Sequence, residues 1–337
     1  MKESIRQRAR DLGFDDCRFT TAAPPESANH FQRWLEQGRH GEMSYLARNA
    51  PKRTNPDLVL SGAKTIITLA TSYSPAAGRA TSHATIARYA RYADYHDVLA
   101  GKLKALTDFV DQLARPNTRS LWYTDTGPFL ERDLAQRAGL GFVGKHTNLI
   151  SRQLGNWFFL SEIITTLEIE SDAPEHNRRG NCTRCIAACP TNAIVAPFEL
   201  DARKCISYLT IELKGPIPVE MRAAIGTRIY GCDDCLEVCP WNRFAREGNA
   251  MQPYARADLE TPNLIELLAL NEAGFKSRFA GTPMLRTKRR GFLRNVCVAL
   301  GNLRDPASLR ALQKAAQDPE PLVAEHAKWA IERITSP

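Results

Sequence analysis

The chain has 337 residues, of which 43% are hydrophobic and 24% charged, an ordinary composition for a globular protein with two or three hydrophobic cores. No stretch approaches the ~20 consecutive apolar residues of a membrane-spanning helix, and the charged N-terminus lacks the apolar segment of a secretory signal. The formal net charge of +8 favours a polyanionic partner, nucleic acid before a membrane surface, so we expect a cytoplasmic protein without a membrane partner.

Residues 1–170 have the pattern of an α/β domain, in which buried strands alternate with amphipathic helices. The predicted elements are, in chain order, a helix over 5–12, a strand over 65–71, a helix over 98–113, and strands over 120–124 and 157–167. The predicted fold class for this part of the chain is therefore α/β (α+β).

Two short motifs in this region are incomplete versions of cofactor fingerprints. Gly139-Leu-Gly-Phe-Val-Gly144 has the spacing of GxGxxG, but it follows residues of helical composition instead of a strand, which favours a glycine turn with close backbone approach. Asp94-Tyr-His96 begins like the DxHxxG loop of base-off cobalamin proteins, but Leu99 occupies the glycine position. The sequence therefore gives no support for a histidine-ligated cobalt, and we interpret His96 as a polar residue at a helix start.

Asp125 lies where a predicted strand gives way to a loop, beside Gly127 and Pro128. A carboxylic acid in such a position is a candidate general acid. The same position suits the N-cap of the following helix, and the local sequence leaves both interpretations open. Glu131 and Asp133 are expected on the solvated face of that helix.

Seven of the nine cysteines lie between Cys182 and Cys239, which in a cytosolic chain indicates metal or redox chemistry. They include two copies of the C-x₂-C-x₃-C-P pattern of bacterial ferredoxins, in which the cysteine before proline ligates the other cluster. Zinc is the alternative, because paired CxxC motifs also form Cys₄ sites, but zinc has no use for a third cysteine followed by proline. We therefore predict iron–sulfur clusters, and we interpret Cys17 and Cys297, in helical patterns, as plain buried thiols.

A pair of [4Fe–4S] clusters needs eight cysteines, and this region has seven. The ferredoxin pattern places the missing one at Arg179. We call this exchange of the cysteine before proline between the two clusters the crossover rule. It gives one cluster the full set Cys189, Cys205, Cys232 and Cys235. The other has three cysteines, Cys182, Cys185 and Cys239. This second site would hold a three-iron cluster, recruit a non-cysteine ligand or be damaged, and the sequence leaves these options open.

The C-terminal part of the chain is predicted to be helical. Residues 171–180 form a polar linker, and 248–262 form a second loop-rich joint. The amphipathic helices that follow are predicted over 292–300, 309–316 and 322–334. Asp-Pro turns separate them, which is typical of a HEAT-like helical repeat.

A basic run, Arg286-Thr-Lys-Arg-Arg290, is followed by Arg294 at the start of this helical region. Charge runs usually mark a solvated face. Five positive side chains within nine residues of an already basic chain also suit contact with phosphates, so both interpretations are kept.

Longer motifs, taken together, resemble the epoxyqueuosine reductase family over almost the whole chain. They are His40–Met43, Tyr45–Arg48, Arg88–Ala90, Asp94–His96, Asp125–Arg132, Ala138–Lys145, Cys205–Leu213, Tyr230–Cys235 and Cys239–Asn242. The resemblance implies an oxidoreductase of queuosine biosynthesis that reduces epoxyqueuosine to queuosine at the wobble position of tRNA anticodons. It implies cobalamin and two [4Fe–4S] clusters as cofactors, with tRNA and an external electron donor (a reductase, flavodoxin or ferredoxin) as partners of a monomer.

The same resemblance implies an architecture and a set of site residues. It divides the chain into a cobalamin-binding catalytic domain (1–170), a ferredoxin-like two-cluster domain (171–250) and a HEAT-like helical module that binds tRNA (251–337). Asp125 matches the proton donor of the family. The implied cobalamin contacts are Arg53, Lys145, His146, Asn148 and Ser207. The implied tRNA contacts are Lys214, Arg286, Lys288, Arg289, Arg290 and Arg294.

The chain departs from the family pattern at two positions, with Arg179 in place of a cysteine and Tyr92 in place of a glycine. Two other functions are alternatives to the one that the family resemblance implies. One is a reductive dehalogenase-like cobalamin and iron–sulfur enzyme for a small molecule, which would need no polyanion-binding surface. The other is a zinc-stabilised tRNA-binding protein without redox activity, which would lack the colour of iron–sulfur clusters.

Overall fold

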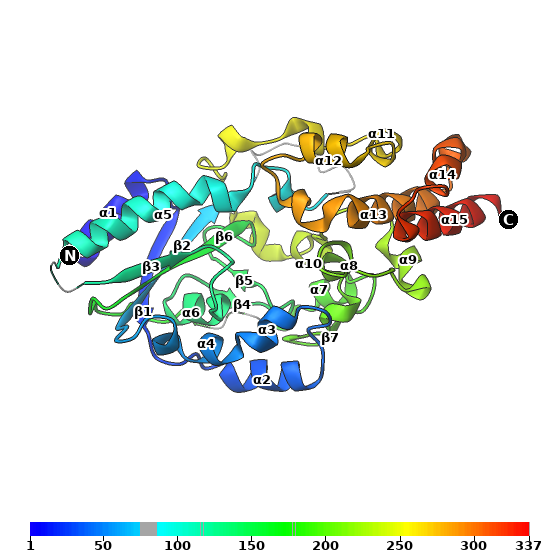
Figure 1. The fold of residues 1–337 in the computed structure, drawn as a ribbon. Helices are drawn as coiled ribbons and strands as arrows, with labels where there is room; N and C mark the ends of the chain where they lie inside the picture. The colour runs from blue at the N-terminus through cyan, green and yellow to red at the C-terminus, as the bar shows by residue number, and fades with distance from the viewer. Residues whose placement is uncertain (75–85, 115, 117, 177, 179, 337) are drawn as a thin grey trace.

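The structure is a computed structural model that describes residues 1–74, 86–114, 116, 118–176, 178 and 180–336 (Figure 1). Its N-terminal part is built around a four-stranded antiparallel sheet with the strand order β1-β2-β6-β3. The strands are β1 Asp16–Thr21, β2 Thr65–Ser72, β3 Ser120–Tyr123 and β6 Phe158–Thr165. Every residue of β2 is buried because this central strand is covered on both faces, which accounts for its continuous run of apolar and threonine residues.

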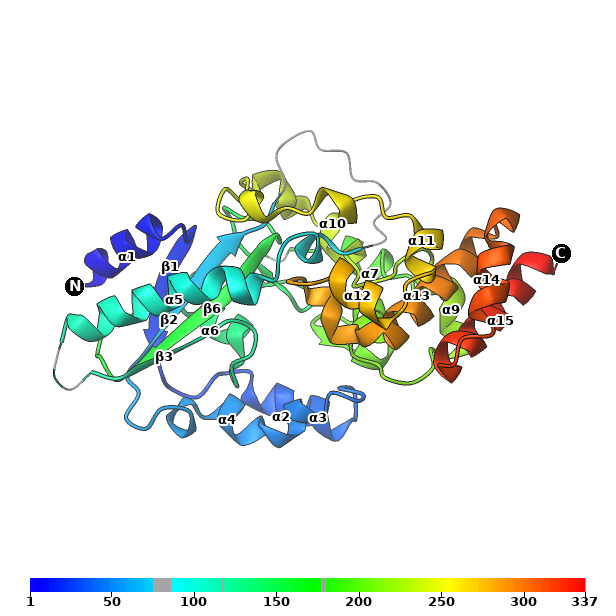
Figure 2. The ribbon, with the colours of Figure 1, turned by 45° about the horizontal axis from the view of Figure 1, so that its top comes forward.

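Helices cover the two faces of this sheet. α1 (Lys2–Asp11) and α5 (Tyr95–Gln112) lie along one face (Figure 2). Leu99 of α5 and Ile67 of β2 belong to the same buried hydrophobic cluster. α6 (Glu131–Arg137) covers the other face. The layer is completed by short helices α2 Ala28–Glu36, α3 Ser44–Arg48 and α4 Ala50–Thr54 (Figure 1).

A tight glycine turn follows α6 and leads into the small hairpin of β4 (Phe142–Val143) and β5 (Leu149–Ile150). Gly139 has a φ of +83°, and a Cβ added there would stand 2.3 Å from the carbonyl oxygen of Ala173. The interpretation of the GxGxxG-like segment as a turn with close backbone approach is therefore confirmed.

The cysteine-rich part contains short helices that begin inside the two cysteine motifs, α7 Arg184–Ala187 and α10 Asp234–Glu237. Both are one turn long, and each stops just before a Cys-Pro pair, because proline cannot continue a helix. The remaining elements of this part are β7 Ile194–Ala196, β8 Glu199–Leu200, α8 Ile206–Ile211 and α9 Val219–Ile225.

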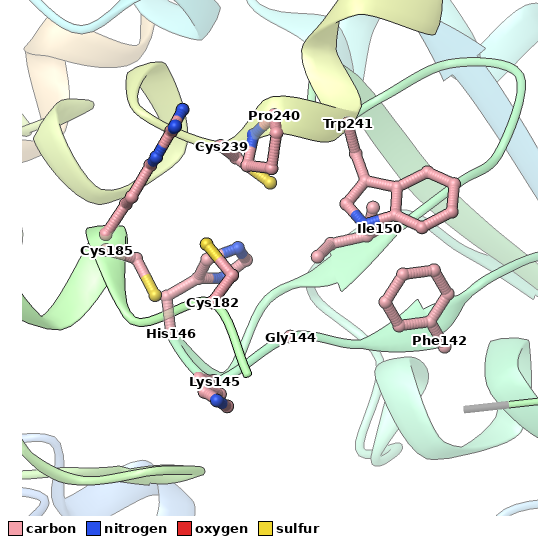
Figure 3. A pocket seen from close by; sticks show the side chains of 11 residues that line it. Phe142, Gly144, Lys145, His146, Ile150, Cys182, Cys185, Cys239, Pro240 and Trp241 are labelled. Carbon is pink, nitrogen blue, oxygen red and sulfur yellow. The ribbon is translucent and has the colours of Figure 1, made fainter. Parts of the chain in front are cut away.

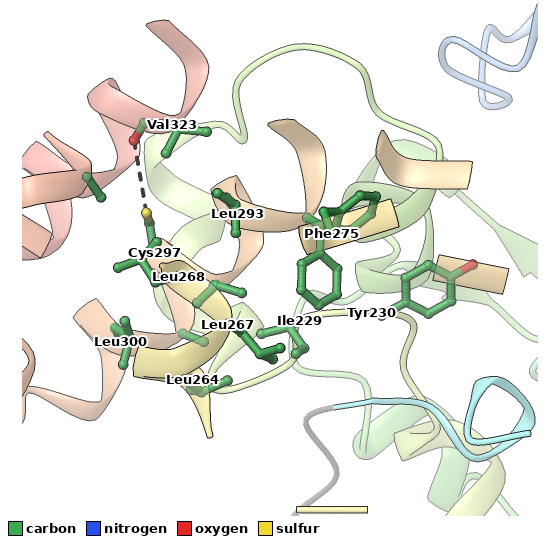
Figure 4. Packing of buried hydrophobic residues seen from close by; sticks show 14 of the residues in the cluster. Ile229, Tyr230, Leu264, Leu267, Leu268, Phe275, Leu293, Cys297, Leu300 and Val323 are labelled. Atoms are coloured by element: carbon green, nitrogen blue, oxygen red, sulfur yellow. Dashed lines mark hydrogen bonds between the residues drawn. The ribbon is translucent and has the colours of Figure 1, made fainter. Parts of the chain in front are cut away.

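The C-terminal part is helical, and its core is shown in Figure 4. Its helices are α11 Leu264–Leu268, α12 Glu272–Arg278, α13 Lys288–Leu303, α14 Leu309–Ala315 and α15 Pro321–Thr335. α13 is the centre, with a buried middle that packs on α15 and on α8 and α9 of the cysteine-rich part. Ile229 and Tyr230, which precede the second cysteine motif, are buried in the same core. The helical part and the cysteine-rich part therefore share a packed boundary.

The predicted helices and strands of the N-terminal part are all present, and the three predicted C-terminal helices correspond to α13, α14 and α15. The prediction for Cys17 was wrong in one respect, because this buried thiol lies in β1 and not in a helix. Cys297 is buried in α13 as expected. Among the described residues, no helix has both the length and the apolar character needed to cross a bilayer.

Candidate redox and catalytic site

The structure gathers the seven clustered cysteines into two neighbouring groups. Cys182, Cys185 and Cys239 line one pocket (Figure 3). The thiols of the second group act electrostatically on one another and are Cys189, Cys205, Cys232 and Cys235. These are the same two sets that the crossover rule predicts from the sequence.

The two groups are placed by the short helices and turns of the cysteine-rich part. α7 and α10 pack against each other, which brings the cysteine before each proline beside the other motif. In the described part of the chain, no three His, Cys, Asp or Glu side chains converge closely enough to hold a single ion.

The pocket of the three-cysteine group has walls that are partly apolar. Phe142, Ile150 and Trp241 stand on one side of it, and the loop Gly144–His146 stands on another (Figure 3). His146 is buried, and its Nε2 atom has no hydrogen-bond partner in the described part of the chain. The position of the missing eighth cysteine, Arg179, lies outside the described residues.

Asp125 stands on an exposed loop at the end of β3 and has a φ of +57°, a conformation that non-glycine residues rarely adopt. Its Oδ2 accepts a hydrogen bond of 2.6 Å from the hydroxyl of Tyr95, the first residue of α5. Burial, and then the charge of Asp125, raise the pKa of Tyr95, so this hydroxyl remains a donor at neutral pH. The N-cap alternative for Asp125 is wrong, because α6 begins after Leu130.

A second group of charged side chains surrounds Asp125 on the α6 face of the sheet. Arg53 donates a 2.8 Å hydrogen bond to the carbonyl oxygen of Phe129, and its charge interacts with Glu131 and Asp125. The Nε atom of Arg53 is buried without a hydrogen-bond partner in the described part of the chain. An orphaned guanidinium nitrogen of this kind fits a site that receives a polar cofactor or substrate group.

Glu131 was expected on a solvated helix face, and that expectation was wrong. Its carboxyl Oε1 is buried, and its side chain lies within hydrogen-bonding range of Glu162, which is 0% exposed. Burial, and then the charge of Asp125, raise the pKa of Glu131 to about 8, and burial and Glu131 raise the pKa of Glu162 well above its usual range. Two buried carboxyls in contact can avoid repulsion by sharing one proton.

Glu162 and Tyr95 were not identified from the sequence. Glu162 lies in the middle of β6, which is otherwise an apolar, buried strand, and its register partners are Thr68 and Tyr123. A charged residue inside such a run is itself a signal of a polar site, because an unpartnered buried charge is costly. Tyr95 carried no comparable signal.

α6 connects the acidic site with both cysteine groups. Its first residue, Glu131, interacts with Asp125, and the next residue, Arg132, acts electrostatically on Cys205 and on His146. Arg132 is also held by a 3.2 Å hydrogen bond from its Nη1 to the carbonyl oxygen of Thr147. The first turn of this helix therefore lies within electrostatic range of Asp125 on one side and of Cys205 and His146 on the other.

The remaining predicted cofactor contacts lie around the cysteine groups. Lys145 and His146 line the three-cysteine pocket, and Asn148 closes the same loop by donating its amide to Nδ1 of His146. Ser207 is half-buried in α8, two residues after Cys205. Arg53 is the predicted cofactor contact that the structure brings to Asp125.

The predicted tRNA contacts fall into two classes. Lys214, Lys288 and Arg290 are exposed. The prediction for Arg294 was wrong, because this side chain is 1% exposed and its guanidinium donates to the carbonyl oxygens of Leu209, Leu213 and Gly215.

Two other arginines of the basic run have partners within the protein. Arg289 pairs with Asp318 and donates to the carbonyl oxygen of Leu270. Arg286 pairs with Asp94 at 2.8 Å and lies over the ring of Tyr95 at 5.6 Å, so it stands close to the Asp125 loop. Only part of the basic run is therefore available to an external phosphate.

Comparison with known proteins agrees with this arrangement. Residues 179–242 match the family described as 4Fe-4S double cluster binding domain, and residues 53–126 match epoxyqueuosine reductase QueG, DUF1730. The epoxyqueuosine reductase of Xanthomonas campestris pv. campestris is 41% identical over 341 aligned residues, which cover 97% of this chain and 94% of that protein.

Two solved structures are similar over nearly the whole chain. One is an epoxyqueuosine reductase with an epoxyqueuosine-modified tRNA-Tyr stem loop, with a TM-score of 0.89, 33% identity and coverage of 99% of this chain and 90% of that one. The other is the Bacillus subtilis epoxyqueuosine reductase with its aspartate catalytic loop swung out of the active site, with a TM-score of 0.89, 32% identity and the same coverage. The chain belongs to the epoxyqueuosine reductase family.

Proposed function

We propose that this protein reduces epoxyqueuosine to queuosine in tRNA, with Asp125 as the proton donor. The observation that carries the proposal is the Asp125 loop, whose carboxylate accepts a 2.6 Å hydrogen bond from the Tyr95 hydroxyl. It lies in the same chain as two groups of clustered cysteines, and Arg132 of the neighbouring α6 acts electrostatically on Cys205 of one group. The family supports it, since the Bacillus subtilis relative has an aspartate catalytic loop at its active site.

Removal of an epoxide oxygen to leave an alkene consumes two electrons and two protons and releases water. The oxygen departs as an alkoxide or hydroxide unless it is protonated, so a donor at that atom lowers the barrier; general acids contribute about 10²–10⁴-fold. Asp125 is exposed on its loop and therefore free to reach a substrate oxygen. The carboxyl pair Glu131–Glu162, buried next to it, retains a proton at neutral pH and is a second source.

Two kinds of cofactor complete the proposal. The cysteine groups would hold iron–sulfur clusters, one with four thiolates and one with three. The residues that would contact cobalamin are Arg53, Lys145, His146, Asn148 and Ser207. When bound, the clusters would supply single electrons and the corrinoid would supply reducing equivalents for the substrate. The fit to a corrinoid rests on the orphaned Nε of Arg53 beside Asp125 and on the resemblance of the chain to the family.

The tRNA would lie across the helical part of the chain. We assign residues 1–170 to the catalytic domain, 171–250 to the ferredoxin-like domain and 251–337 to a HEAT-like tRNA-binding module. Lys214, Lys288 and Arg290 are exposed and contribute phosphate contacts, while Arg286 connects that surface to the Asp125 loop through Tyr95. An external electron donor reduces the protein.

The test is anaerobic reconstitution of the full chain with iron, sulfide and cobalamin, followed by incubation with epoxyqueuosine-containing tRNA and a chemical reductant. Nucleoside analysis by mass spectrometry measures conversion to queuosine. We expect conversion only when metal, corrinoid and reductant are all supplied. A protein that binds zinc, stays colourless and leaves the epoxide intact would overturn the proposal.

A further inference from the structure

His146 belongs to the loop that is expected to contact cobalamin, and it also lines the pocket of the three-cysteine group. His146 lies beside Cys182, Cys185 and Cys239, and its imidazole is directed into the space between them (Figure 3). It is 3% exposed, and Nε2 has no hydrogen-bond partner in the described part of the chain. Buried ring nitrogens are normally partnered, so this atom requires an explanation.

The local backbone fixes the orientation of this ring. The backbone N–H of Asn148 donates a 3.1 Å hydrogen bond to Nδ1 of His146. Thr147, between them, has a φ of +70°, which tightens the loop. Gly144 leaves room for the ring, because a Cβ at that position would stand 2.8 Å from Cε1 and 2.9 Å from Nε2 of His146. The loop is therefore shaped around the imidazole.

The same hydrogen bond identifies the tautomer. A backbone N–H can only donate, so Nδ1 accepts and carries no proton. A ring whose Nδ1 carries no proton is the neutral tautomer, so its one N–H proton resides on Nε2. The group that faces the cysteines is consequently an N–H donor that makes no well-formed hydrogen bond within the described part of the chain.

We propose that Nε2–H of His146 donates a hydrogen bond to a sulfur of the cluster held by Cys182, Cys185 and Cys239, and so raises the reduction potential of that cluster. The inference rests on the proposed iron–sulfur function. Hydrogen bonds to cluster sulfurs are one of the factors that set reduction potential, because they stabilise the more negative, reduced state.

Two other arrangements compete with this one. Asn156 also lies against the ring, and its Oδ1 is likewise without a partner, so it could be the acceptor of the Nε2 proton. Alternatively, Nε2 could bind iron directly in place of the cysteine that is absent at position 179. Direct ligation would require Nε2 to lose its proton while Nδ1 still faces the Asn148 amide, which disfavours it.

The experiment compares anaerobically reconstituted wild type with His146→Leu, His146→Gln and, as a control, His176→Leu at an exposed position. Iron per chain is counted, and midpoint potentials are measured by redox titration monitored by EPR. We expect unchanged iron in all four proteins and a lower midpoint potential of one cluster in His146→Leu. The amide N–H of His146→Gln should restore the potential in part, and His176→Leu should match the wild type.

Pulsed EPR of protein labelled with ¹⁵N-histidine adds a readout that does not depend on turnover. A weak hyperfine coupling between the ¹⁵N nucleus and the cluster indicates an N–H···S hydrogen bond, and a strong one indicates an Fe–N bond. Unchanged potentials in His146→Leu with full iron content would overturn the proposal and leave Asn156 as the acceptor. Loss of iron in His146→Leu that Arg179→Cys restores, or a strong nitrogen coupling, would overturn it in favour of direct ligation. A wild-type protein that takes up no iron defeats the proposed function itself, and the inference with it.

Discussion

At the scale of single residues, the acid site depends on how few partners its carboxyl groups have. Asp125 has one side-chain hydrogen bond, from Tyr95, on a loop with positive φ. Apart from the proton that the pair can share, both carboxyl oxygens of Glu162 and Oε1 of Glu131 have no hydrogen-bond donor in the described part of the chain. Such an arrangement is costly for folding, and sites of this kind are usually retained because the chemistry needs them.

The first prediction concerns Asp125. Asp125→Asn removes the acidic proton but keeps the size of the side chain, so we expect turnover to fall by about 10²–10⁴-fold while tRNA binding is unchanged. Single-turnover conversion and a binding titration separate the two effects. Asp97→Asn, at an exposed position in the first turn of α5, serves as the control. Near-wild-type turnover in Asp125→Asn would remove this residue from the mechanism.

The second prediction concerns the pH dependence of stability. The pKa of Glu131 is raised to about 8 in the folded protein, and the pKa of Glu162 is also raised. Between the usual pKa of 4.5 for a glutamate and pH 8, the folded state therefore binds more protons than the unfolded state. Stability therefore decreases as pH rises through this window. Glu162→Gln should flatten that decrease in urea unfolding curves, whereas Glu168→Gln, at an exposed position, should not. An unaltered slope in Glu162→Gln would show that the pair shares no proton.

At the scale of elements, α13 joins the helical part to the cysteine-rich part. Arg294 donates to three carbonyl oxygens at the end of α8, and Asn295 donates to the carbonyl oxygens of Thr210 and Ile229. These contacts satisfy backbone groups that the end of α8 and the following loop leave unpaired. The two side chains therefore hold the segment that precedes the second cysteine motif.

The third prediction tests this role. Arg294→Leu should lower the free energy of unfolding by about 3–5 kcal/mol, because buried carbonyl groups lose their charged donor. Arg290→Gln, on the exposed side of the same helix, should change it by less than about 0.5 kcal/mol. Urea unfolding of both variants decides the matter, and equal stabilities would mean that Arg294 is not a structural link.

The limits of prediction from sequence are clearest in these elements. Hydrophobic periodicity located β2, α5 and β6, and the spacing of seven cysteines predicted the two groups that the structure brings together. The sequence could not reveal that Arg294 faces inward, because a basic run has the same composition whether its members are solvated or buried. It also could not identify the contact between Glu131 and Glu162, which depends on how α6 lies over β6.

At the scale of the whole molecule, the net charge of +8 is not spread evenly over available side chains. Arg286 is exposed but ion-paired, Arg289 is ion-paired and Arg294 is buried. Lys288 and Arg290 are the exposed cations of the basic run that have no ion pair among the described residues. A polyanion that binds here meets a smaller positive surface than the sequence implies. The affinity for tRNA must then come from several separate patches, of which Lys214 is another.

The last prediction follows from that distribution of charge. Each lysine or arginine that neutralises a phosphate releases counterions. The slope of log affinity against log salt is negative, and loss of one such residue reduces its magnitude by about 0.7–0.9. We expect the double variant Lys288→Gln/Arg290→Gln to reduce the magnitude of this slope by about 1.5 for a tRNA stem loop and to weaken binding at low salt. The matched control removes two exposed lysines from the N-terminal part, Lys64→Gln/Lys104→Gln, and should leave the slope unchanged. If both double variants behave alike, the basic run is a solvated face and the tRNA is held elsewhere, because only charges at the interface release counterions.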